Sequence, residues 1–359
     1  MVKYAIAMLC MLKDDYVLGA CISSYALKQL IKESIHKNNI DLIIMCDKYI
    51  YKKYGKLLSN YFNKVILINL HHFNWINGYQ HLSKTIAKKY AWLNYSVNKW
   101  QCLKYDEYDK LLFIDIDILP MKKEFYNIFF NSTPCFHHIF QESMGRHDID
   151  MKKCINNYKT VDILKKYNSF YDYINNNKDY VYNKKSGMGG YTIDGGIVLL
   201  KPDKKVYEKY KEFVYRTFEK GLYTFKTSGP DETTLFYFYQ KIVGNESYRI
   251  CDEYLVVPWD SPELAKTTMA YNYIQFIKPW LKPAFLSWPE ELLWRKIYNI
   301  MPKNGDIKQL FKKTLVYGYD IYLKLDTRQR TKWFNKTNEK DIKEPTYEKI
   351  RTIEKKMNI

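Results

Sequence analysis

The first 120 residues alternate short apolar runs with longer amphipathic stretches, and this alternation restricts the chain to few folds. The apolar runs are bounded by charged residues, as expected of strands covered on both faces of a sheet. The predicted strands are Tyr4–Met11, Asp41–Cys46, Val65–Leu70 and Leu111–Ile116, and the predicted helices are Gly19–Lys37, Tyr49–Phe62 and Ser83–Leu103. Strands that alternate with helices predict an α/β fold around a parallel sheet, with a ligand beyond the carboxyl ends of its strands.

The later part of the chain has a different pattern. Residues 131–191 are rich in Asn, Lys and Tyr and contain few apolar runs, which predicts an insertion or mobile loop region. We expect one domain over 1–285 that includes this region, followed by a basic helical C-terminal extension over 286–359. The predicted elements of this part are a strand over Thr192–Leu200, helices over Val206–Lys220 and Pro230–Tyr239, and a helical stripe of Leu292, Leu293, Ile297 and Ile300.

Composition excludes several classes of protein. The net charge is +18, from 57 Lys and Arg against 39 Asp and Glu. Lys, Asn, Ile and Tyr are all frequent and share A/T-rich codons, so the charge indicates codon bias and a solvated surface. The lysines are spread along the whole chain, so a nucleic-acid partner is not expected. The seven cysteines are scattered singly, which favours a reducing, cytoplasmic location over a disulfide scaffold. No apolar run approaches the roughly 20 residues of a membrane helix, so we expect no transmembrane segment.

Two carboxylates mark the end of the fourth apolar run. Asp115 and Asp117 follow this run, and Pro120 ends the segment. In an extended chain this spacing puts both carboxylates on one face, where burial is unfavourable unless the charges are paired. A hard divalent cation such as Mn²⁺ or Mg²⁺, carried with a diphosphate, is the natural partner. The motif therefore predicts a metal site that would stabilise a departing nucleotide diphosphate.

Six short blocks form an ordered set along the chain. The blocks are Asp15–Ala20, Asn94–Leu103, Asp115–Asp117, Asp194–Val198, Gly229–Glu232 and Lys278–Trp280. Together they resemble glycosyltransferase family 8, the glycogenin-like group, and most closely its viral glycogenin-like branch. This resemblance implies a GT-A fold with a mainly parallel mixed sheet. It also implies a retaining hexosyltransferase that uses Mn²⁺ and a nucleotide-diphosphate sugar, with UDP-glucose or UDP-galactose expected, in the host-cell cytoplasm if the chain is viral.

The resemblance also assigns donor-binding roles to individual residues. Tyr16 would stack on or near the uracil, and Lys99 would approach the donor phosphate or ribose. Asp115 and Asp117 would hold the metal, with Asp115 also near the ribose. Lys278 would contact the diphosphate as a point charge and help to stabilise the leaving group.

Sugar binding and catalysis are assigned to two other blocks. Asp194 and the backbone of Gly195 and Gly196 would face the sugar hydroxyls, because glycines let a backbone approach a ligand closely. Asp231 and Glu232 would lie near the reacting carbon. Carboxylates in the first turn of a helix also stabilise that helix, so capping is the competing interpretation of this pair.

The chain departs from the family's pattern at three positions. The third metal ligand of the family, a His six residues before the Lys of Lys-Pro-Trp, is replaced by Asn272, and Gln275 is the alternative if the loop register shifts. Asp194 and Glu232 stand where the family has Asn and Gln, and both add negative charge. Glu232 could act as a nucleophile or stabilise an oxocarbenium-like centre, or the donor phosphate could take the acceptor proton; the residues leave these routes open.

The acceptor and two rival functions complete the set of hypotheses. The acceptor is a carbohydrate, another protein or the chain itself, and a homodimer is a further expectation. The first rival is a degenerate transferase fold that binds a nucleotide sugar or a partner without turnover, which the replacement at Asn272 motivates. The second rival is a basic nucleic-acid-binding protein, motivated by the net charge alone.

Overall fold

The computed structural model describes residues 2–73, 91–139, 192–219, 230–244, 248–250, 254–255, 268–273, 278–281 and 291–323. By its internal contacts the chain divides into two compact units, Met1–Asn272 and Tyr273–Ile359. The domain boundary expected after residue 285 stays a prediction. The division places Lys278 in the second unit and every other described candidate site residue in the first.

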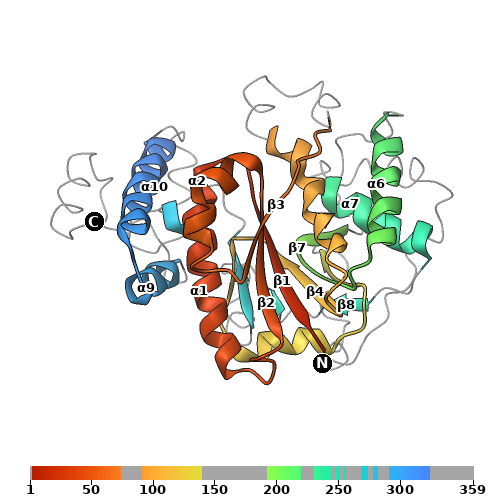
Figure 1. Cartoon of the computed structure of the whole chain (residues 1–359), viewed down its shortest axis with the longest axis horizontal. Helices are drawn as coiled ribbons and strands as arrows, with labels where there is room; N and C mark the ends of the chain where they lie inside the picture. Colours follow the sequence, from red (N-terminus) through yellow and green to blue (C-terminus); the bar gives the residue numbers. More distant parts are fainter. Residues whose placement is uncertain are drawn as a thin grey trace, which may run out of the picture. The chain divides into compact units, whose positions relative to one another are not determined.

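A mixed sheet forms the centre of the first unit (Figure 1). Within the described residues its strand order is β3-β2-β1-β4-β7-β6-β8. The strands β3, β2, β1 and β4 are parallel, β7 is antiparallel to both β4 and β6, and β8 is parallel to β6. The strands are β1 (Tyr4–Cys10), β2 (Ile40–Cys46), β3 (Lys64–Leu67), β4 (Lys110–Ile114), β6 (Cys135–Ile139), β7 (Thr192–Leu200) and β8 (Tyr248–Ile250).

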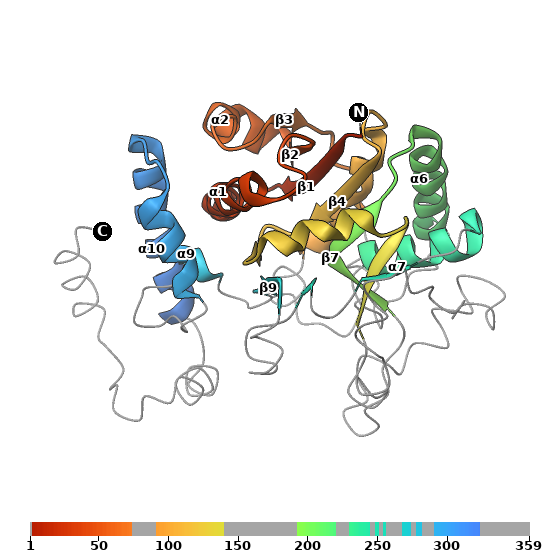
Figure 2. The same cartoon turned by 90° about the horizontal axis from the view of Figure 1, so that it is seen from below.

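Helices cover both faces of this sheet. Figures 1 and 2 show α1 and α2 on one face and α6 and α7 on the other. Strands β1, β2 and β4 are almost entirely buried between these layers, which explains their continuous apolar sequences. The helical segments of this unit are η1 (Asp14–Tyr16), α1 (Val17–Glu33), α2 (Lys48–Leu58), η3 (Ala91–Lys104), η4 (Lys123–Phe130), α6 (Lys204–Glu219), α7 (Pro230–Tyr237) and the π-helical η9 (Phe238–Val243).

A small two-stranded sheet follows the carboxylate motif. Strand β5 (Ile118–Pro120) pairs antiparallel with β9 (Ala270–Asn272). In this register Ile118 lies opposite Asn272. The pairing therefore brings the residue after Asp117 beside a residue more than 150 positions later in the chain.

The structure confirms the predicted α/β class with a mainly parallel mixed sheet, and it corrects some details. The helix predicted over Ser83–Leu103 is helical where the structure describes it, as the 3₁₀ helix η3 over Ala91–Lys104. Strand β6 belongs to the main sheet although it lies within 131–191. It has no continuous apolar run that would predict a strand, because two histidines interrupt its apolar residues. The rest of that region, 140–191, lies outside the described residues.

The described part of the second unit is helical, as expected for the extension. Its elements are η11 (Pro279–Leu281), α9 (Leu292–Ile300) and α10 (Gly305–Leu323). Trp294 is fully buried, with its ring centroid 4.8 Å from that of Trp280 and 5.7 Å from that of Tyr273. The apolar stripe predicted along α9 is not its buried face: Leu293 and Ile297 are half-buried and Ile300 is 70% exposed, whereas Trp294 and Tyr298 are buried. Among the helices that the structure describes, none has the length and apolarity needed to cross a bilayer.

Candidate active site

The loop after β1 is fixed by contacts with α2. The Asp14 carboxylate accepts hydrogen bonds of 2.8 Å from both the Tyr49 hydroxyl and the Lys53 ammonium. This arrangement holds the short helix η1, whose last residue is the half-buried Tyr16. Helix α1 begins at the next residue. Tyr16 thus lies at the carboxyl end of the central strand β1, where an α/β sheet binds its ligand.

Lys99 is the hub of a cluster of carboxylates at the end of β4. Its Nζ lies 3.0 Å from Asp115 Oδ2, 3.0 Å from Asp231 Oδ2 and 3.3 Å from the carbonyl oxygen of Gly195. The ammonium therefore connects η3, the end of β4, the start of α7 and strand β7. On the same helix, the buried Trp100 indole donates a 3.0 Å hydrogen bond to the carbonyl oxygen of Asp231, which fixes α7 against η3.

Strand β7 bulges at the predicted sugar-binding block. Phe136 pairs with Val198, and the next pair is His138 with Ile193, so one residue of β6 faces residues 194–197 of β7. The carbonyl oxygen of Gly196 still accepts a 2.8 Å hydrogen bond from the Asp115 amide, so the bulge remains attached to the end of β4. Bulges of this kind aim side chains away from the regular pleat and are common beside active sites.

The two glycines of the bulge leave no room for a side chain. A Cβ on Gly195 would lie 2.7 Å from Glu232 Cγ and 3.0 Å from Asp231 Oδ2. A Cβ on Gly196 would lie 2.8 Å from Asp194 Oδ1. The backbone and these carboxylates are therefore packed directly against each other, which is the kind of close approach that glycine permits.

We expect Gly195→Ala to displace Glu232 and to weaken donor-sugar binding by about tenfold or more, because the new methyl group overlaps the Glu232 side chain. Gly55→Ala is the matched control, since its Cβ would meet only ring atoms at 3.9 Å and alanine favours the helix α2. Equilibrium binding of a UDP-sugar would be measured for both variants and for the wild type. Equal affinity of Gly195→Ala and wild type would contradict the assignment of this bulge to the sugar.

The first-turn carboxylates of α7 are directed to neighbouring elements. Asp231 pairs with Lys99, and Glu232 Oε1 accepts a 3.2 Å hydrogen bond from the Gly195 amide. These contacts place both side chains beside the sugar block of β7. Asp231 and Glu232, for which both capping and catalysis were considered, therefore lie next to the residues of β7 that were expected to face the sugar.

The electrostatics of the cluster are dominated by negative charge. Burial opposes the charged form of Lys99, but Asp115, Asp231 and Glu232 outweigh burial and raise the pKa of Lys99 above its ordinary value. Burial and the charge of Asp231 raise the pKa of Glu232 to about 8. Burial also raises the pKa of Asp115, with Lys99 opposing the rise. A surplus of carboxylates around one buried ammonium creates a site that a further cation would stabilise.

Asp194 is held in its ionised form by its partners. Its Oδ1 accepts a 2.7 Å hydrogen bond from the Gly196 amide, and its Oδ2 accepts one of 3.3 Å from Asn272 Nδ2. His137 Nδ1 lies 3.7 Å from the same Oδ2. Burial would raise the pKa of Asp194, but the contacts with His137 and Gly196 and the charge of Lys99 outweigh it, so the pKa is lowered.

Asn272 has the features of a ligand for a hard cation. Its side-chain Nδ2 donates to Asp194, and this contact fixes the amide orientation because the reverse orientation would place two oxygens together. The Oδ1 atom is buried and accepts no hydrogen bond from the described residues. A buried amide oxygen without a donor is unfavourable, and a cation would satisfy it. The backbone of Asn272 lies opposite Ile118, the residue after Asp117.

The predicted ligand set fits a hard cation in chemistry, although it is not a conventional cluster. Among the residues that the structure describes, no three His, Cys, Asp or Glu side chains form a metal-binding group. The set of Asp115, Asp117 and Asn272 comprises two carboxylates and one amide, all oxygen donors of the kind that Mg²⁺ and Mn²⁺ accept. The alternative ligand Gln275 lies outside the described residues.

Two further residues, His137 and Lys278, lie in different units of the chain. His137 is not among the site residues expected from the sequence, and the bulge in β7 puts it against Asp194. Lys278 is buried in the second unit, and its Nζ donates a 3.0 Å hydrogen bond to the carbonyl oxygen of Tyr273. Its predicted contact with the diphosphate stays a prediction.

Comparison with known proteins gives partial sequence similarity. No family model matches the chain. Two Glycogenin-2 sequences from Saccharomyces cerevisiae, of strains YJM789 and ATCC 204508 / S288c, are 25% and 26% identical to it over 127 residues. The match covers 32% of this chain, and the chain spans only 31% of each of these relatives.

Several solved structures align with most of the chain at low identity. The glycosyltransferase GlyE of Streptococcus pneumoniae TIGR4 aligns with 88% of this chain and 64% of its own, with 13% identity and a TM-score of 0.44. The galactosyltransferase LgtC, solved with donor and acceptor sugar analogs, aligns with 85% of this chain and 99% of its own, with 13% identity and a TM-score of 0.42. Mouse xyloside xylosyltransferase 1 aligns with 76% of this chain and 98% of its own, with 13% identity and a TM-score of 0.39.

Proposed function

We propose that this chain is a glycosyltransferase of the GT-A fold that transfers a hexose, with retention, from a nucleotide-diphosphate sugar in a metal-dependent reaction. The observation that carries the proposal is the carboxylate cluster around Lys99 at the end of β4, directly beside the glycine bulge of β7. The partial similarity to the Glycogenin-2 sequences supports the same class of reaction.

The donor would occupy the carboxyl edge of the parallel strands. Tyr16 would stack against the base, and Lys99 with Asp115 would position the ribose and phosphates. Asp115, Asp117 and the Asn272 amide would hold Mn²⁺ or Mg²⁺, which neutralises diphosphate charge and so stabilises the leaving group. In the same proposal Lys278 contacts the diphosphate as a second positive charge.

The sugar would lie against the bulge of β7. Gly195 and Gly196 let Glu232, Asp231 and Asp194 pack closely against the backbone, so the sugar would meet these carboxylates, and Asp194 would accept hydrogen bonds from its hydroxyls. Asp231 is bound to Lys99, so its role is to position that ammonium. Glu232 stands beside Gly195, where it would act as the nucleophile or stabilise positive charge at the anomeric carbon.

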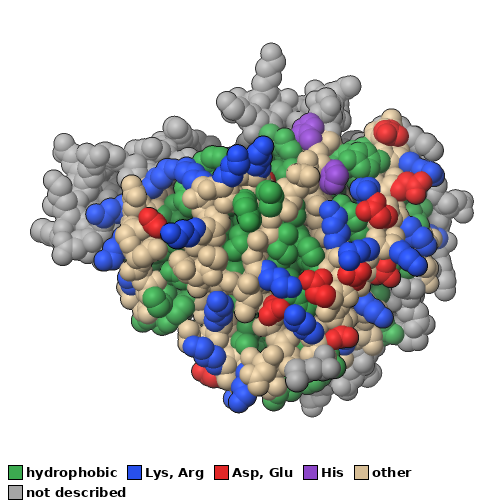
Figure 3. Space-filling model, viewed as in Figure 1, with side chains coloured by type: hydrophobic (Ala, Val, Ile, Leu, Met, Phe, Trp, Pro, Cys, Tyr) green, Lys and Arg blue, Asp and Glu red, His purple; other side chains and the backbone are tan. Residues whose placement is uncertain are grey.

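Several properties of the chain fit this proposal. The five cysteines whose state the structure gives are free and buried, consistent with the expected cytoplasmic location. On the face drawn in Figure 3, Lys and Arg side chains are scattered among acidic and apolar ones, which does not favour a nucleic-acid track. The expected acceptor is a carbohydrate, another protein or the chain itself. A homodimer also remains an expectation.

The proposal is tested with a panel of UDP-sugars in Mn²⁺, in Mg²⁺ and in EDTA. We expect release of UDP with one sugar, dependent on metal, and transfer to an acceptor with the anomeric configuration of the donor retained. Intact mass after incubation shows whether the chain modifies itself. Metal-dependent donor binding without any turnover across acceptors would favour the degenerate binding protein, and the absence of donor binding would reject both.

A further inference from the structure

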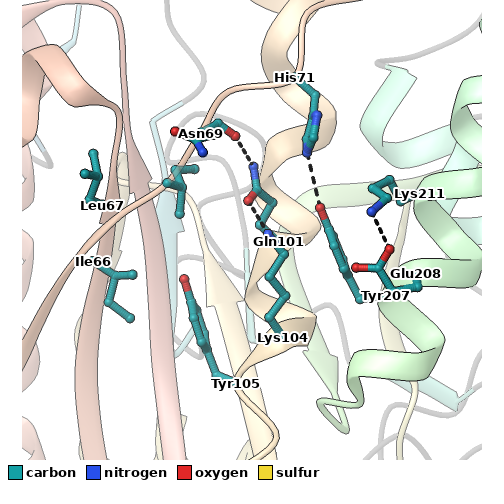
Figure 4. Close-up of a pocket in the computed structure, with 11 residues that line it drawn as sticks. Ile66, Leu67, Asn69, His71, Gln101, Lys104, Tyr105, Tyr207, Glu208 and Lys211 are labelled. Atoms are coloured by element: carbon teal, nitrogen blue, oxygen red, sulfur yellow. Dashed lines mark hydrogen bonds and ion pairs between the residues drawn. The ribbon is translucent and has the colours of Figure 1, made fainter.

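A pocket in the first unit is lined by residues that the candidate active site does not use (Figure 4). It is formed by the end of β3 with the segment that follows it, by the last turn of η3 and by helix α6. Its volume is about 340 Å³, within the range of sites that hold small molecules. None of the residues assigned to the donor, the metal or the sugar lines it.

The charge of this pocket is positive. His71, Lys104 and Lys211 line it together with one acidic residue, Glu208. Glu208 is already paired with Lys211 on the same helix. Among the residues that the structure describes, no carboxylate lies within ion-pair distance of Lys104, so the pocket carries positive charge that nothing on its described walls balances.

Lys104 is positioned to bind an anion. Its Nζ donates one hydrogen bond, of 2.7 Å, to Gln101 Oε1 and lies 4.5 Å from the ring centre of Tyr207. An ammonium has three N–H donors, so this arrangement fixes the group without using its full capacity. Burial and the charge of Lys211 lower the pKa of Lys104, although Glu208 opposes the fall. Burial, Lys104 and Lys211 likewise lower the pKa of His71.

The opposite wall is apolar. Ile66 and Tyr105 face the lysines across the pocket, as Figure 4 shows. Polar contacts hold the rim in place: His71 Nδ1 lies 2.8 Å from the hydroxyl of Tyr215, and Gln101 Nε2 donates a 2.8 Å hydrogen bond to the carbonyl oxygen of Asn69. The site thus combines a fixed positive end with an apolar wall.

We propose that this pocket binds a small organic anion, a phosphate monoester or carboxylate with a compact apolar body, through Lys104. The charged group would bind at the Lys104 ammonium, which no described carboxylate pairs, and the body would pack against Ile66 and the ring of Tyr105. This inference does not depend on the proposed transferase activity. It describes a site separate from the donor site.

The test is calorimetric titration in EDTA with phenyl phosphate and with benzoate, and with phenol as the neutral analogue. We expect saturable binding of at least one anion, binding of phenol about tenfold or more weaker, and a loss of about tenfold or more in Lys104→Met, which keeps the apolar stem but removes the charge. Lys209→Met is the matched control, because Lys209 is an exposed lysine of α6 that does not line the pocket.

The outcomes separate this pocket from the donor site. Asp117→Asn is expected to bind the anion as the wild type does, because Asp117 lies in the other cluster. Lys104→Gln, which removes the charge but keeps a polar side chain, should show the same loss as Lys104→Met, and it is the deciding variant if circular dichroism shows that Lys104→Met is misfolded. No saturable binding of either anion, equal binding of phenol, or an equal loss in Lys209→Met would overturn the proposal.

Discussion

Lys99→Met is expected to lower the free energy of unfolding by about 3–5 kcal/mol and to abolish donor binding. The Lys99 ammonium is buried, and it neutralises the equally buried Asp231 at 3.0 Å. Methionine keeps the length of the side chain but leaves that carboxylate uncompensated, which is the most destabilising way to break a buried ion pair. Denaturant unfolding and UDP binding would measure the two effects.

A double variant separates the loss of stability from the loss of function. Lys99→Met/Asp231→Asn removes the uncompensated charge, so we expect it to recover part of the stability and none of the donor binding. Lys52→Met, on the exposed side of α2, is the control and should leave both properties unchanged within about 0.5 kcal/mol. Full donor binding by the double variant would contradict a role for Lys99 at the donor phosphates.

The local sequence predicted those parts of the fold that depend on continuous patterns. The strands β1, β2 and β4 are buried on both faces, so their apolar runs could be recognised without knowledge of their partners. The same runs located Asp115 and Asp117, because a carboxylate pair at the end of a buried strand is conspicuous. The resemblance to the glycogenin-like group then brought Lys99, Asp194 and Glu232 into the candidate site.

The remaining features depend on pairing between distant segments, which no local pattern contains. His137 contacts Asp194 only because β7 bulges opposite it, and the bulge is a property of the register between β6 and β7. The amide orientation of Asn272 depends in the same way on Asp194 and on the pairing of β9 with β5. The pocket at Lys104 joins three elements whose residues have no common motif.

Asp117→Asn is expected to reduce metal-dependent turnover by about a hundredfold or more while leaving the fold intact. The variant replaces one of two proposed carboxylate ligands in a set whose third proposed member is only an amide, so little would remain to hold a divalent cation. Its effect on stability should have the opposite sign to that of Lys99→Met. The cluster has a surplus of negative charge, so loss of one carboxylate should leave the melting temperature in EDTA unchanged or slightly higher.

Metal binding by Asp117→Asn can also be measured without turnover, from the shift of the melting temperature that the ligand causes. Wild type should gain stability from Mn²⁺ with UDP, because a ligand that binds only the folded state stabilises it, and Asp117→Asn should lose this gain. Asp106→Asn, at an exposed aspartate paired with Lys204, is the matched control and should keep it. Asn272→His should enlarge the gain at low Mn²⁺, since an imidazole is a stronger ligand for this metal than an amide. If Asp117→Asn kept the full shift while Asn272→His changed nothing, the cation would not be bound by this set of residues.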